Sequence, residues 1–372
     1  MKTTKISRFL LLSALSLSFF TSCEKDNTPS GFKNLENGVL VLNQGQDGKN
    51  NASLSYYDLT TSLTTEDIFS ERNNRKVGDV AQDVIRYGSN IYITLTNSSI
   101  VEVVNATTGM SIKTIPMFNT PIGTSATHPS KPRSLAALNG KVYITLLDGH
   151  LARLDTTTLT IDKTIAVGTN PEGIAVANNK LYVANSGGYN YQINAKADST
   201  ISVIDPATFS EIKKIKVLIN PTIIKADKYG DLYVLSMGNY WDIPSALQRI
   251  EGSTDKVTAI ADVKAVNFTI EDDNAYIYNY EYDAVTYAVI NKSYSVYDVK
   301  NEKVLKTNFI ASSAIAQTPY SIDVDPLTKN VFIGETDYVN TGKMYCFGSD
   351  GALKYTFNTG VNPSKTAFIT NK

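Results

Sequence analysis

Histidine and cysteine are scarce in this chain of 372 residues, which has two of each. His128 and His150 lie in separate segments, as do Cys23 and Cys346. No His-x-x-His, Cys-x-x-Cys or Gly-x-Ser-x-Gly sequence occurs, so the common signatures of zinc sites and nucleophilic hydrolases are missing. We therefore expect no metal site and no catalytic residues, and we interpret the protein as not an enzyme.

An excess of charge of one sign is also lacking. Lys and Arg number 35 against 36 Asp and Glu, and no long run of like charge occurs. Nucleic-acid binding proteins concentrate basic residues because they must neutralise phosphates, so we expect no nucleic-acid partner. Cys346 lies in the apolar segment 344–347, where a lone thiol is expected to be inert core.

The N-terminus contains an apolar stretch, Phe9–Phe20, that follows three basic residues. It is too short to span a membrane as a helix and has the arrangement of a secretory signal. It ends in Phe20-Thr21-Ser22-Cys23, which resembles a bacterial lipobox, although Phe20 stands where Leu or Val is usual. We predict a lipoprotein signal peptide over residues 1–22 and lipidation of Cys23. The alternative is an ordinary secretory signal with an incidental cysteine.

The next residues, Glu24-Lys25-Asp26-Asn27, are short and charged. They resemble the export signal that places some Gram-negative lipoproteins on the outer face of the outer membrane. We predict a lipidated flexible tether over residues 23–36. The expected location is therefore the outer membrane, lipid-anchored and exposed at the cell surface.

A short strand of the pattern hydrophobic–Tyr–hydrophobic recurs through the rest of the chain. The seven copies, two of them without Tyr, are Val39-Leu40-Val41, Ile91-Tyr92-Ile93, Val142-Tyr143-Ile144, Leu181-Tyr182-Val183, Leu232-Tyr233-Val234, Ala275-Tyr276-Ile277 and Val331-Phe332-Ile333. Their central residues are 39 to 56 positions apart. Such periods are typical of solenoids and propellers, whose blades carry about 40–50 residues, so the copies predict seven structural repeats.

Each repeat contains further segments of alternating polarity that are rich in Val, Ile and Thr. A Pro and an apolar run precede the Tyr strand, and a strand ending in Asp or Asn, a Thr-rich turn and a last strand follow it. Four such antiparallel strands make a propeller blade, and no segment shows a convincing helical period. We predict an all-β fold over residues 37–372: a seven-bladed β-propeller with four-stranded antiparallel blades.

The two ends of the predicted propeller complement each other. The first repeat begins at its second strand, 39–42, whereas residues 362–369 form a first strand with no blade after it. We expect the C-terminal strand to complete the first blade and close the ring, which leaves no open edge.

Two positions that recur in every repeat bear on chemistry. One position per blade faces the mouth of the central channel, and it is occupied by Gln82, Arg133, Glu172, Thr222, Val266, Tyr320 and Ser364. One carboxylate in seven is a poor metal ring, since a hard cation needs several oxygen ligands, and Arg133 and Glu172 are placed to pair. The third strands end in Asp58, Asn105, Asp155, Asp205 and Asp298, which we expect to cap the following turns.

The loops after the second strands are unusual because they carry Tyr, Asn and the single Trp of the chain. They emerge on one face of the ring, and exposed stiff aromatic rings beside amides are typical of a binding surface. We predict the ligand-binding residues Asn185, Tyr189, Tyr191, Asn239, Tyr240, Trp241, Tyr280, Tyr282 and Tyr338; Tyr287 lies in the same region. The alternative is that these rings pack within their own loops.

Three segments also carry a resemblance to a known family. They are 41–45 continuing through 53–58, then 78–83, and finally 170–175 with 181–187. With the lipobox and the seven repeats, they resemble the surface-exposed propeller lipoproteins of the cobalamin-binding BtuG family, over nearly the whole mature chain. The shared motifs are mostly scaffold and specify the family better than the ligand.

The resemblance implies a protein that captures vitamin B12 or a related corrinoid outside the cell. It would cap a TonB-dependent outer-membrane transporter of the BtuB type, with cobalamin as the transported ligand rather than a cofactor. A corrinoid suits the aromatic face, since it offers apolar ring surface and a rim of amides. A binding module for another ligand such as a glycan, and an enzyme of lactonase or lyase type, are the alternatives.

Overall fold

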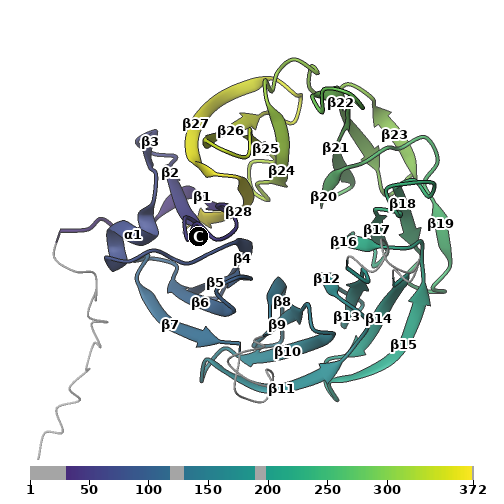
Figure 1. Ribbon diagram of the computed structural model, residues 1–372, viewed down its shortest axis with the longest axis horizontal. Coiled ribbons are helices and arrows are strands. Elements are labelled where there is room, and N and C mark those ends of the chain that lie inside the picture. Colours follow the sequence, from purple (N-terminus) through teal and green to yellow (C-terminus); the bar gives the residue numbers. More distant parts are fainter. Residues whose placement is uncertain (1–30, 118–129, 189–197, 371–372) are drawn as a thin grey trace, which may run out of the picture.

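The computed structural model describes residues 31–117, 130–188 and 198–370. Seven antiparallel sheets of four strands stand around a central channel as the blades of a propeller (Figure 1). The predicted all-β, seven-bladed fold is therefore confirmed.

Each blade stacks its four strands from the channel outward. Blade I holds β28 (Pro363–Thr370), β1 (Asn37–Asn43), β2 (Ser53–Asp58) and β3 (Leu63–Thr65); blade II holds β4 (Ala81–Tyr87), β5 (Asn90–Leu95), β6 (Ile100–Asn105) and β7 (Ser111–Pro116). Blade III holds β8 (Pro132–Leu138), β9 (Lys141–Leu146), β10 (His150–Asp155) and β11 (Thr160–Ala166); blade IV holds β12 (Pro171–Ala177), β13 (Lys180–Asn185), β14 (Thr200–Asp205) and β15 (Ser210–Lys216). Blade V holds β16 (Pro221–Ala226), β17 (Leu232–Ser236), β18 (Ala246–Ile250) and β19 (Val257–Ala259). Blade VI holds β20 (Asn267–Glu271), β21 (Asn274–Tyr282), β22 (Val289–Asp298) and β23 (Lys303–Lys306); blade VII holds β24 (Thr318–Val324), β25 (Val331–Thr336), β26 (Thr341–Phe347) and β27 (Leu353–Val361).

The recurrent Tyr strand is the second strand of its blade, and it is buried on both faces. Tyr92 of β5 packs with Val142 and Ile144 of blade III, and Tyr143 of β9 packs with Leu181 of blade IV. Both faces of a blade are thus covered by neighbouring blades, which explains why these strands are apolar throughout instead of alternating. The core lies between the blades and makes the ring one packed body.

The ring closes as predicted. Strand β28 pairs antiparallel with β1, with Val39 opposite Phe368 and Leu40 opposite Ala367. Ala367 and Ile369 join the apolar cluster between blades I and II. The C-terminal strand therefore supplies the innermost strand of the blade that the N-terminus begins.

One short helix accompanies the strands of this all-β fold. A short helix, α1 (Ile68–Asn73), follows β3, and the Asp67 carboxylate caps it by accepting a hydrogen bond from the Ser70 amide at 3.1 Å. A helix of six residues spans fewer than two turns, so it is too short to show a 3.6-residue period in the sequence.

The residues just before β1 pack against the propeller. Leu35 is buried, and its amide donates to the carbonyl of Thr107 at 2.7 Å. Arg72 donates through Nη2 to the Lys33 carbonyl at 2.8 Å. Residues 33–36 thus belong to the folded body, whereas the predicted tether extended to residue 36. The predicted signal peptide over 1–22, Cys23 and the remainder of the tether to residue 30 lie outside the described residues.

The predicted turn caps are confirmed at all five positions. The Oδ1 atoms of the third-strand residues each accept the amide two residues ahead, over distances of 2.8–3.0 Å, at Asp58, Asn105, Asp155, Asp205 and Asp298. Cys346 is buried in β26, and burial raises the pKa of its thiol, as expected for an inert core position.

Candidate functional site

Antiparallel order divides the loops between two faces of the ring. Loops that follow second and fourth strands emerge on one face, which we call the upper face, and those that follow first and third strands emerge on the lower face. Those predicted binding residues that the structure describes belong to second strands or the loops after them, at the upper end of their blades.

Five aromatic side chains of blades V to VII stand out on the upper face. Trp241 is 93% exposed, Tyr287 is 77% exposed, and Tyr240, Tyr282 and Tyr338 are 61%, 51% and 40% exposed. We call these five residues the aromatic crest. Val285 and Val339 are exposed in the same loops and extend the apolar surface. Such a concentration of exposed large apolar groups on one face is typical of an interaction surface.

The loop that carries Tyr240 and Trp241 is held by Asn239. Its Oδ1 accepts hydrogen bonds from the amides of Trp241, Asp242 and Ile243 at 2.9–3.1 Å. Gly238 has φ +66°, and a Cβ there would lie 2.0 Å from the Ile243 carbonyl oxygen, so this tight approach requires glycine. Asn239 is therefore the internal brace of the loop, whereas Tyr240 and Trp241 are the side chains that it presents.

Aspartates brace the other two crest loops in the same way. Asp283 Oδ1 accepts from the amides of Val285 and Thr286 at 3.1 and 2.7 Å. Asp337 Oδ1 accepts from the amides of Val339 and Asn340 at 2.9 and 2.7 Å. Hydrogen bonds from the side chain and the backbone amide of Asn340 are the largest causes that lower the pKa of Asp337 to about 2. The crest loops are thus tied internally at neutral pH.

Three crest tyrosines adopt the left-handed backbone conformation. Tyr240, Tyr287 and Tyr338 have φ of +58°, +55° and +67°. Bulky residues rarely adopt positive φ, which costs about 1–2 kcal/mol per residue, and such outliers concentrate at functional sites. Among the described tyrosines these are the ones with positive φ, and all three are in the crest.

The predicted residues of blades VI and VII meet in a continuous tyrosine seam. The half-buried ring of Tyr280 packs edge-on against Tyr282 at 5.4 Å, and the Tyr282 and Tyr338 hydroxyls are 3.2 Å apart. The Tyr338 ring lies 5.8 Å from that of Tyr320, whose hydroxyl donates to Gln44 Oε1 of blade I. Burial raises the pKa of Tyr320 to about 12. Tyr280 supports the crest from below, and Tyr240 and Trp241 form a separate group on blade V.

A hollow lies between blades V and VI, beside two of the crest loops. Its volume is about 650 Å³, and its lining includes Ser245, Lys264, Asn279 and Ser293. Volumes of roughly 300–1,000 Å³ are typical of small-molecule sites. A ligand on the crest could therefore insert a polar group here.

Asn185 does not belong to the exposed surface. It is fully buried at the end of β13, where its Oδ1 accepts from the Gly168 amide at 3.0 Å and its Nδ2 donates to the hydroxyls of Thr200 and Ser202. Asn43 of blade I occupies the same position and donates to Ser53 and Ser55 at 3.0 and 2.9 Å. The prediction of Asn185 as a surface ligand contact therefore needs correction: its side chain ties β13 to β14. Tyr189 and Tyr191 lie outside the described residues.

Replacing Asn185 tests this structural role. Asn185→Leu is expected to lower the free energy of unfolding by about 2–4 kcal/mol, because the Gly168 amide and two hydroxyls lose their buried partner. Urea unfolding of the variant and the parent measures the difference. Unchanged stability would show that the buried network contributes little, and would return Asn185 to the candidate surface residues.

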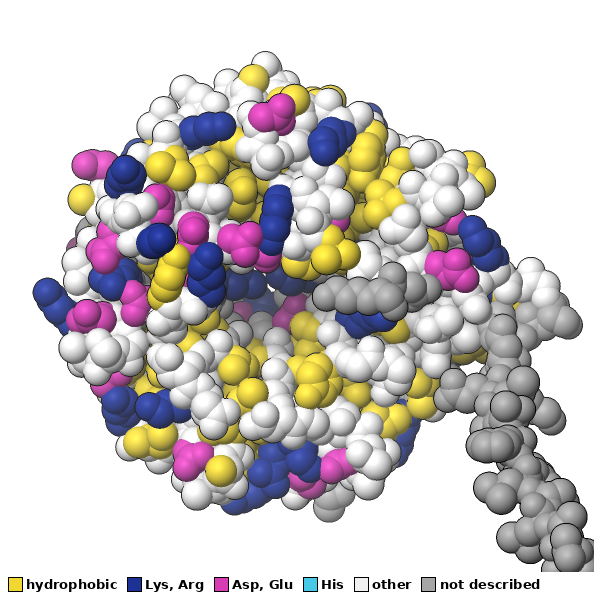
Figure 2. Space-filling view, turned by 180° about the vertical axis from the view of Figure 1, so that it is seen from behind, with side chains coloured by type: hydrophobic (Ala, Val, Ile, Leu, Met, Phe, Trp, Pro, Cys, Tyr) yellow, Lys and Arg dark blue, Asp and Glu magenta, His cyan; other side chains and the backbone are white. Residues whose placement is uncertain are grey.

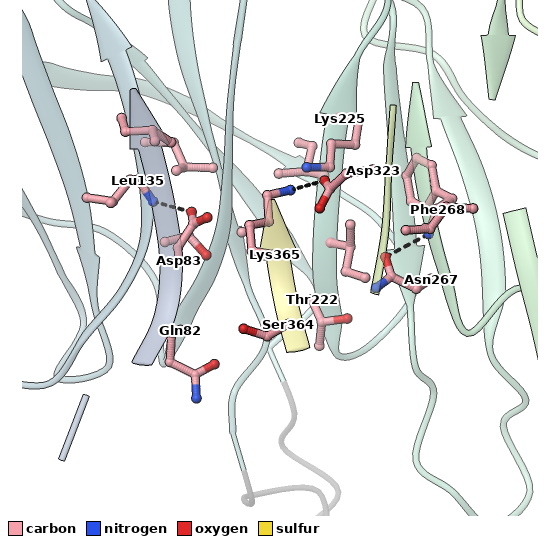
Figure 3. Close-up of a pocket in the computed structure, with 17 residues that line it drawn as sticks. Gln82, Asp83, Leu135, Thr222, Lys225, Asn267, Phe268, Asp323, Ser364 and Lys365 are labelled. Carbon is pink, nitrogen blue, oxygen red and sulfur yellow. Dashed lines mark hydrogen bonds and ion pairs between the residues drawn. The ribbon is translucent and has the colours of Figure 1, made fainter. Parts of the chain in front are cut away.

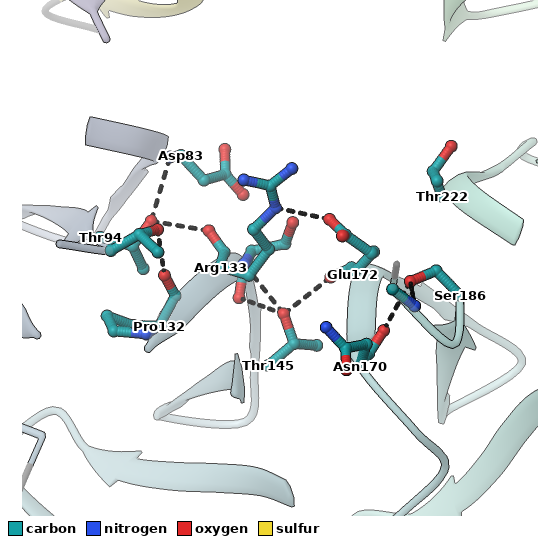
Figure 4. A network of polar contacts seen from close by, with 12 residues as sticks. Asp83, Thr94, Pro132, Arg133, Thr145, Asn170, Glu172, Ser186 and Thr222 are labelled. Atoms are coloured by element: carbon teal, nitrogen blue, oxygen red, sulfur yellow. Dashed lines mark hydrogen bonds and ion pairs between the residues drawn. The ribbon is translucent and has the colours of Figure 1, made fainter. Parts of the chain in front are cut away.

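The channel mouth is polar, and its predicted pair forms. Arg133 Nε donates to Glu172 Oε2 at 2.5 Å, linking blades III and IV. Figure 4 shows Thr145 between the same blades, where its hydroxyl accepts the Ser134 amide at 2.9 Å and donates to the Glu172 carbonyl at 2.7 Å. These residues connect neighbouring blades, as a structural role requires.

Deeper in the channel the structure reveals four charged residues that the sequence repeats did not indicate. Asp83, Lys225, Asp323 and Lys365 line a cavity of about 310 Å³ (Figure 3). In Figure 2 the centre of the ring is hollowed, and side chains of both charges are visible inside it. Asp83 and Lys365 stand at one repeat position, and Lys225 and Asp323 stand at another two residues further on. The other blades carry neutral residues at both positions, so no recurrence in the sequence marks these charges.

Metal-binding and membrane-spanning features are both missing from the part of the chain that the structure describes. Within 31–117, 130–188 and 198–370, no group of three or more His, Cys, Asp or Glu side chains could hold a metal ion. His150 lies 3.1 Å from Asp148 through Nδ1 and Oδ1, and His128 falls outside these ranges. No helix in the same ranges is long and apolar enough to cross a bilayer.

Comparison with known proteins supports the fold. No protein-family model matches the chain, and no curated protein matches its sequence. A chain of hydrazine synthase from Kuenenia stuttgartiensis is 16% identical, with a TM-score of 0.60 over 76% of this chain and 87% of that one. A chain of the mitotic checkpoint complex is 11% identical, with a TM-score of 0.56 over 98% and 90%. The WD40 repeats of RRP9 are 10% identical, with a TM-score of 0.53 over 75% and 83%. At these identities the likeness shows a β-propeller and carries no ligand or activity.

Proposed function

We propose that the protein is a surface binding protein that captures vitamin B12 or a related corrinoid on the aromatic crest. The carrying observation is the crest itself: five exposed rings on one face, three of them on residues in a strained backbone conformation. A rigid frame that presents stiff amphipathic rings loses little entropy on binding. The proposed role is capture without catalysis.

The shape and chemistry of the upper face support this choice of ligand class. The crest spreads over three blades, which suits a broad ligand with apolar ring surface better than a small metabolite. Asn279, Ser245 and Ser293 line the adjacent hollow and offer partners for peripheral amides. A corrinoid combines these features, with its apolar macrocycle on the rings and its amides toward the hollow.

The cellular setting is a further part of the proposal and rests on sequence resemblance. The lipobox at Cys23 and the likeness to the BtuG family support a lipid anchor in the outer membrane and exposure at the cell surface. The proposed partner is a TonB-dependent transporter of the BtuB type, which would receive the ligand.

A glycan is the second candidate ligand. Trp241 is almost fully exposed and stands apart from the tyrosine seam, with Asn239 and Asp242 beside it. A flat ring flanked by polar groups is the usual platform for a sugar. A glycan would therefore depend on Trp241 more than on Tyr282 or Tyr338.

Binding of cyanocobalamin tests the proposal directly. The chain lacking residues 1–23, which retains every described strand, is mixed with cyanocobalamin and separated by size exclusion while the corrin absorbance is followed. We expect corrin colour to elute with the protein. Colour that elutes as free ligand, at protein concentrations well above micromolar, would exclude corrinoid capture and make a glycan the first candidate.

Three variants locate the ligand. Trp241→Ala and Tyr287→Gly are each expected to weaken binding about tenfold or more, as is usual for exposed aromatic contacts. Tyr287→Gly should also keep or raise stability, because glycine adopts φ +55° without strain. Tyr229→Ala removes an exposed ring from the lower-face loop between β16 and β17, and should leave binding unchanged. Equal effects of all three would place the ligand elsewhere.

A further inference from the structure

The charged layer of the channel is built by the innermost strands of four blades. Asp83 comes from β4, Lys225 from β16, Asp323 from β24 and Lys365 from β28 (Figure 3). Thr222 and Ser364 lie one layer further toward the upper face, and Ile224 and Phe268 provide apolar wall. The cavity therefore has its charges at one level, with neutral side chains around them.

The two carboxylates already have close partners. Asp323 accepts from Lys365 Nζ through Oδ1 and from the Thr366 amide through Oδ2, both at 2.8 Å. Asp83 accepts from the amides of Leu135 and Val84 at 2.8 and 2.9 Å. Lys225, in contrast, makes no ion pair with a carboxylate of the described residues. Its side chain instead hydrogen-bonds with that of Lys365, so the two lysines lie side by side at the cavity, with both carboxylates near them.

The pKa values of the two channel lysines differ because their neighbours differ. The nearby Lys365 ammonium, followed by burial, lowers the pKa of Lys225 to about 8. Burial alone would lower the pKa of Lys365, but Asp323 and Asp83 outweigh it and raise that pKa. The two neighbouring ammonium groups therefore repel each other, and an anion in contact with both would relieve that repulsion.

We propose that the central channel binds one small, singly charged anion of the carboxylate class in the cavity, in contact with the ammonium groups of Lys225 and Lys365. The cavity of about 310 Å³ has room for an anion of a few carbon atoms together with water. Asp83 and Asp323 face the same space and oppose a second negative charge, so a monoanion is favoured over phosphate or sulfate. The Thr222 and Ser364 hydroxyls of the next layer donate to the carbonyls of Leu235 and Leu42, so the anion is held by the two lysines. This site is separate from the aromatic crest.

Thermal stability and lysine titration test the site together. The protein is melted in sodium acetate and in the sodium salt of PIPES, a bulky disulfonate, at equal ionic strength. An anion bound to the folded state raises the melting temperature with its concentration. The pKa of Lys225 is followed by NMR of reductively ¹³C-methylated lysines, with the Lys225 signal assigned by its loss in Lys225→Arg. We expect acetate to raise the melting temperature and to raise the pKa of Lys225 by about one unit or more, because the anion stabilises its charged form.

Matched variants separate the site from general salt effects. Lys225→Met should lose the acetate-dependent rise in melting temperature, whereas Lys225→Arg, which keeps the charge, should retain it. Lys354→Met is the control, because Lys354 contacts Asn330 at the outer strand of blade VII and is remote from the channel. If Lys225→Met fails to fold, the titration of the parent protein decides alone. Equal melting temperatures and equal Lys225 pKa values in the two salts would overturn the proposal.

Discussion

A chain that ends at Gly360, and therefore lacks β28, is expected not to fold. Strand β28 pairs along the whole of β1, from Asn37 opposite Thr370 to Asn43 opposite Pro363. It also buries Ala367 and Ile369 between blades I and II, where each lost aliphatic side chain costs roughly 1–5 kcal/mol. The loss of a core strand with its hydrogen bonds exceeds the total stability of about 5–15 kcal/mol typical of a domain. Circular dichroism and a thermal melt should show no cooperative transition.

A permuted chain provides the matched control for this truncation. It begins with residues 361–370, continues through a flexible Gly/Ser linker to residue 31 and ends at Gly360. All residues of the ring are then present and β28 can pair with β1 as before. We expect this chain to melt cooperatively within several degrees of the parent. If the truncated chain melts like the permuted one, six complete blades and one three-stranded blade are sufficient for a stable fold, which would contradict this prediction.

The architecture could be predicted because the information is periodic. A strand buried on both faces must be apolar throughout, and a central Tyr at five such strands marks each one in the sequence. Ring closure could be predicted because the first repeat lacks its innermost strand, whereas one extra strand of that kind follows the last repeat. The turn caps followed from the recurrence of Asp or Asn at one blade position, as at Asp58 and Asp155.

The errors arose where a recurrence was overlooked or where no period exists. Asn185 was predicted to contact ligand, although Asn43 and Asn279 stand at the same position of other blades and all three are buried. Recurrence at one blade position, the argument that identified the turn caps, would have indicated its structural role. The channel charges have no such signal, because the equivalent positions of the other blades carry neutral residues. The exposure of Trp241 and Tyr240 could be predicted because loop residues are free of these constraints.

Alkaline pH is expected to unfold the protein within about one to two units above pH 10, the ordinary pKa of tyrosine. The five tyrosines of the recurrent strand are almost fully buried, and burial raises the pKa of each: Tyr92, Tyr143, Tyr182, Tyr233 and Tyr276. A tyrosine whose pKa is raised on folding contributes stability that is complete below about pH 10 and is lost as pH rises, because the unfolded chain ionises first. Above about pH 10, each buried ring lowers the free energy of unfolding by about 1.4 kcal/mol per pH unit. Five rings together lower it by about 7 kcal/mol per pH unit, which is comparable to the total stability of a domain.

The measurement compares tyrosinate absorbance with circular dichroism along a pH titration. Exposed tyrosines ionise without unfolding and give a gradual first rise in absorbance. A second, cooperative rise should coincide with the loss of circular dichroism, with about five protons released on unfolding by the recurrent tyrosines. Tyr92→Phe combined with Tyr143→Phe should reduce that release by about two protons and flatten the pH dependence of stability. Tyr287→Phe, in the exposed crest, should leave the dependence unchanged. Complete ionisation of all tyrosines with intact circular dichroism would contradict this account, because it would mean that the recurrent rings ionise inside the folded ring of blades.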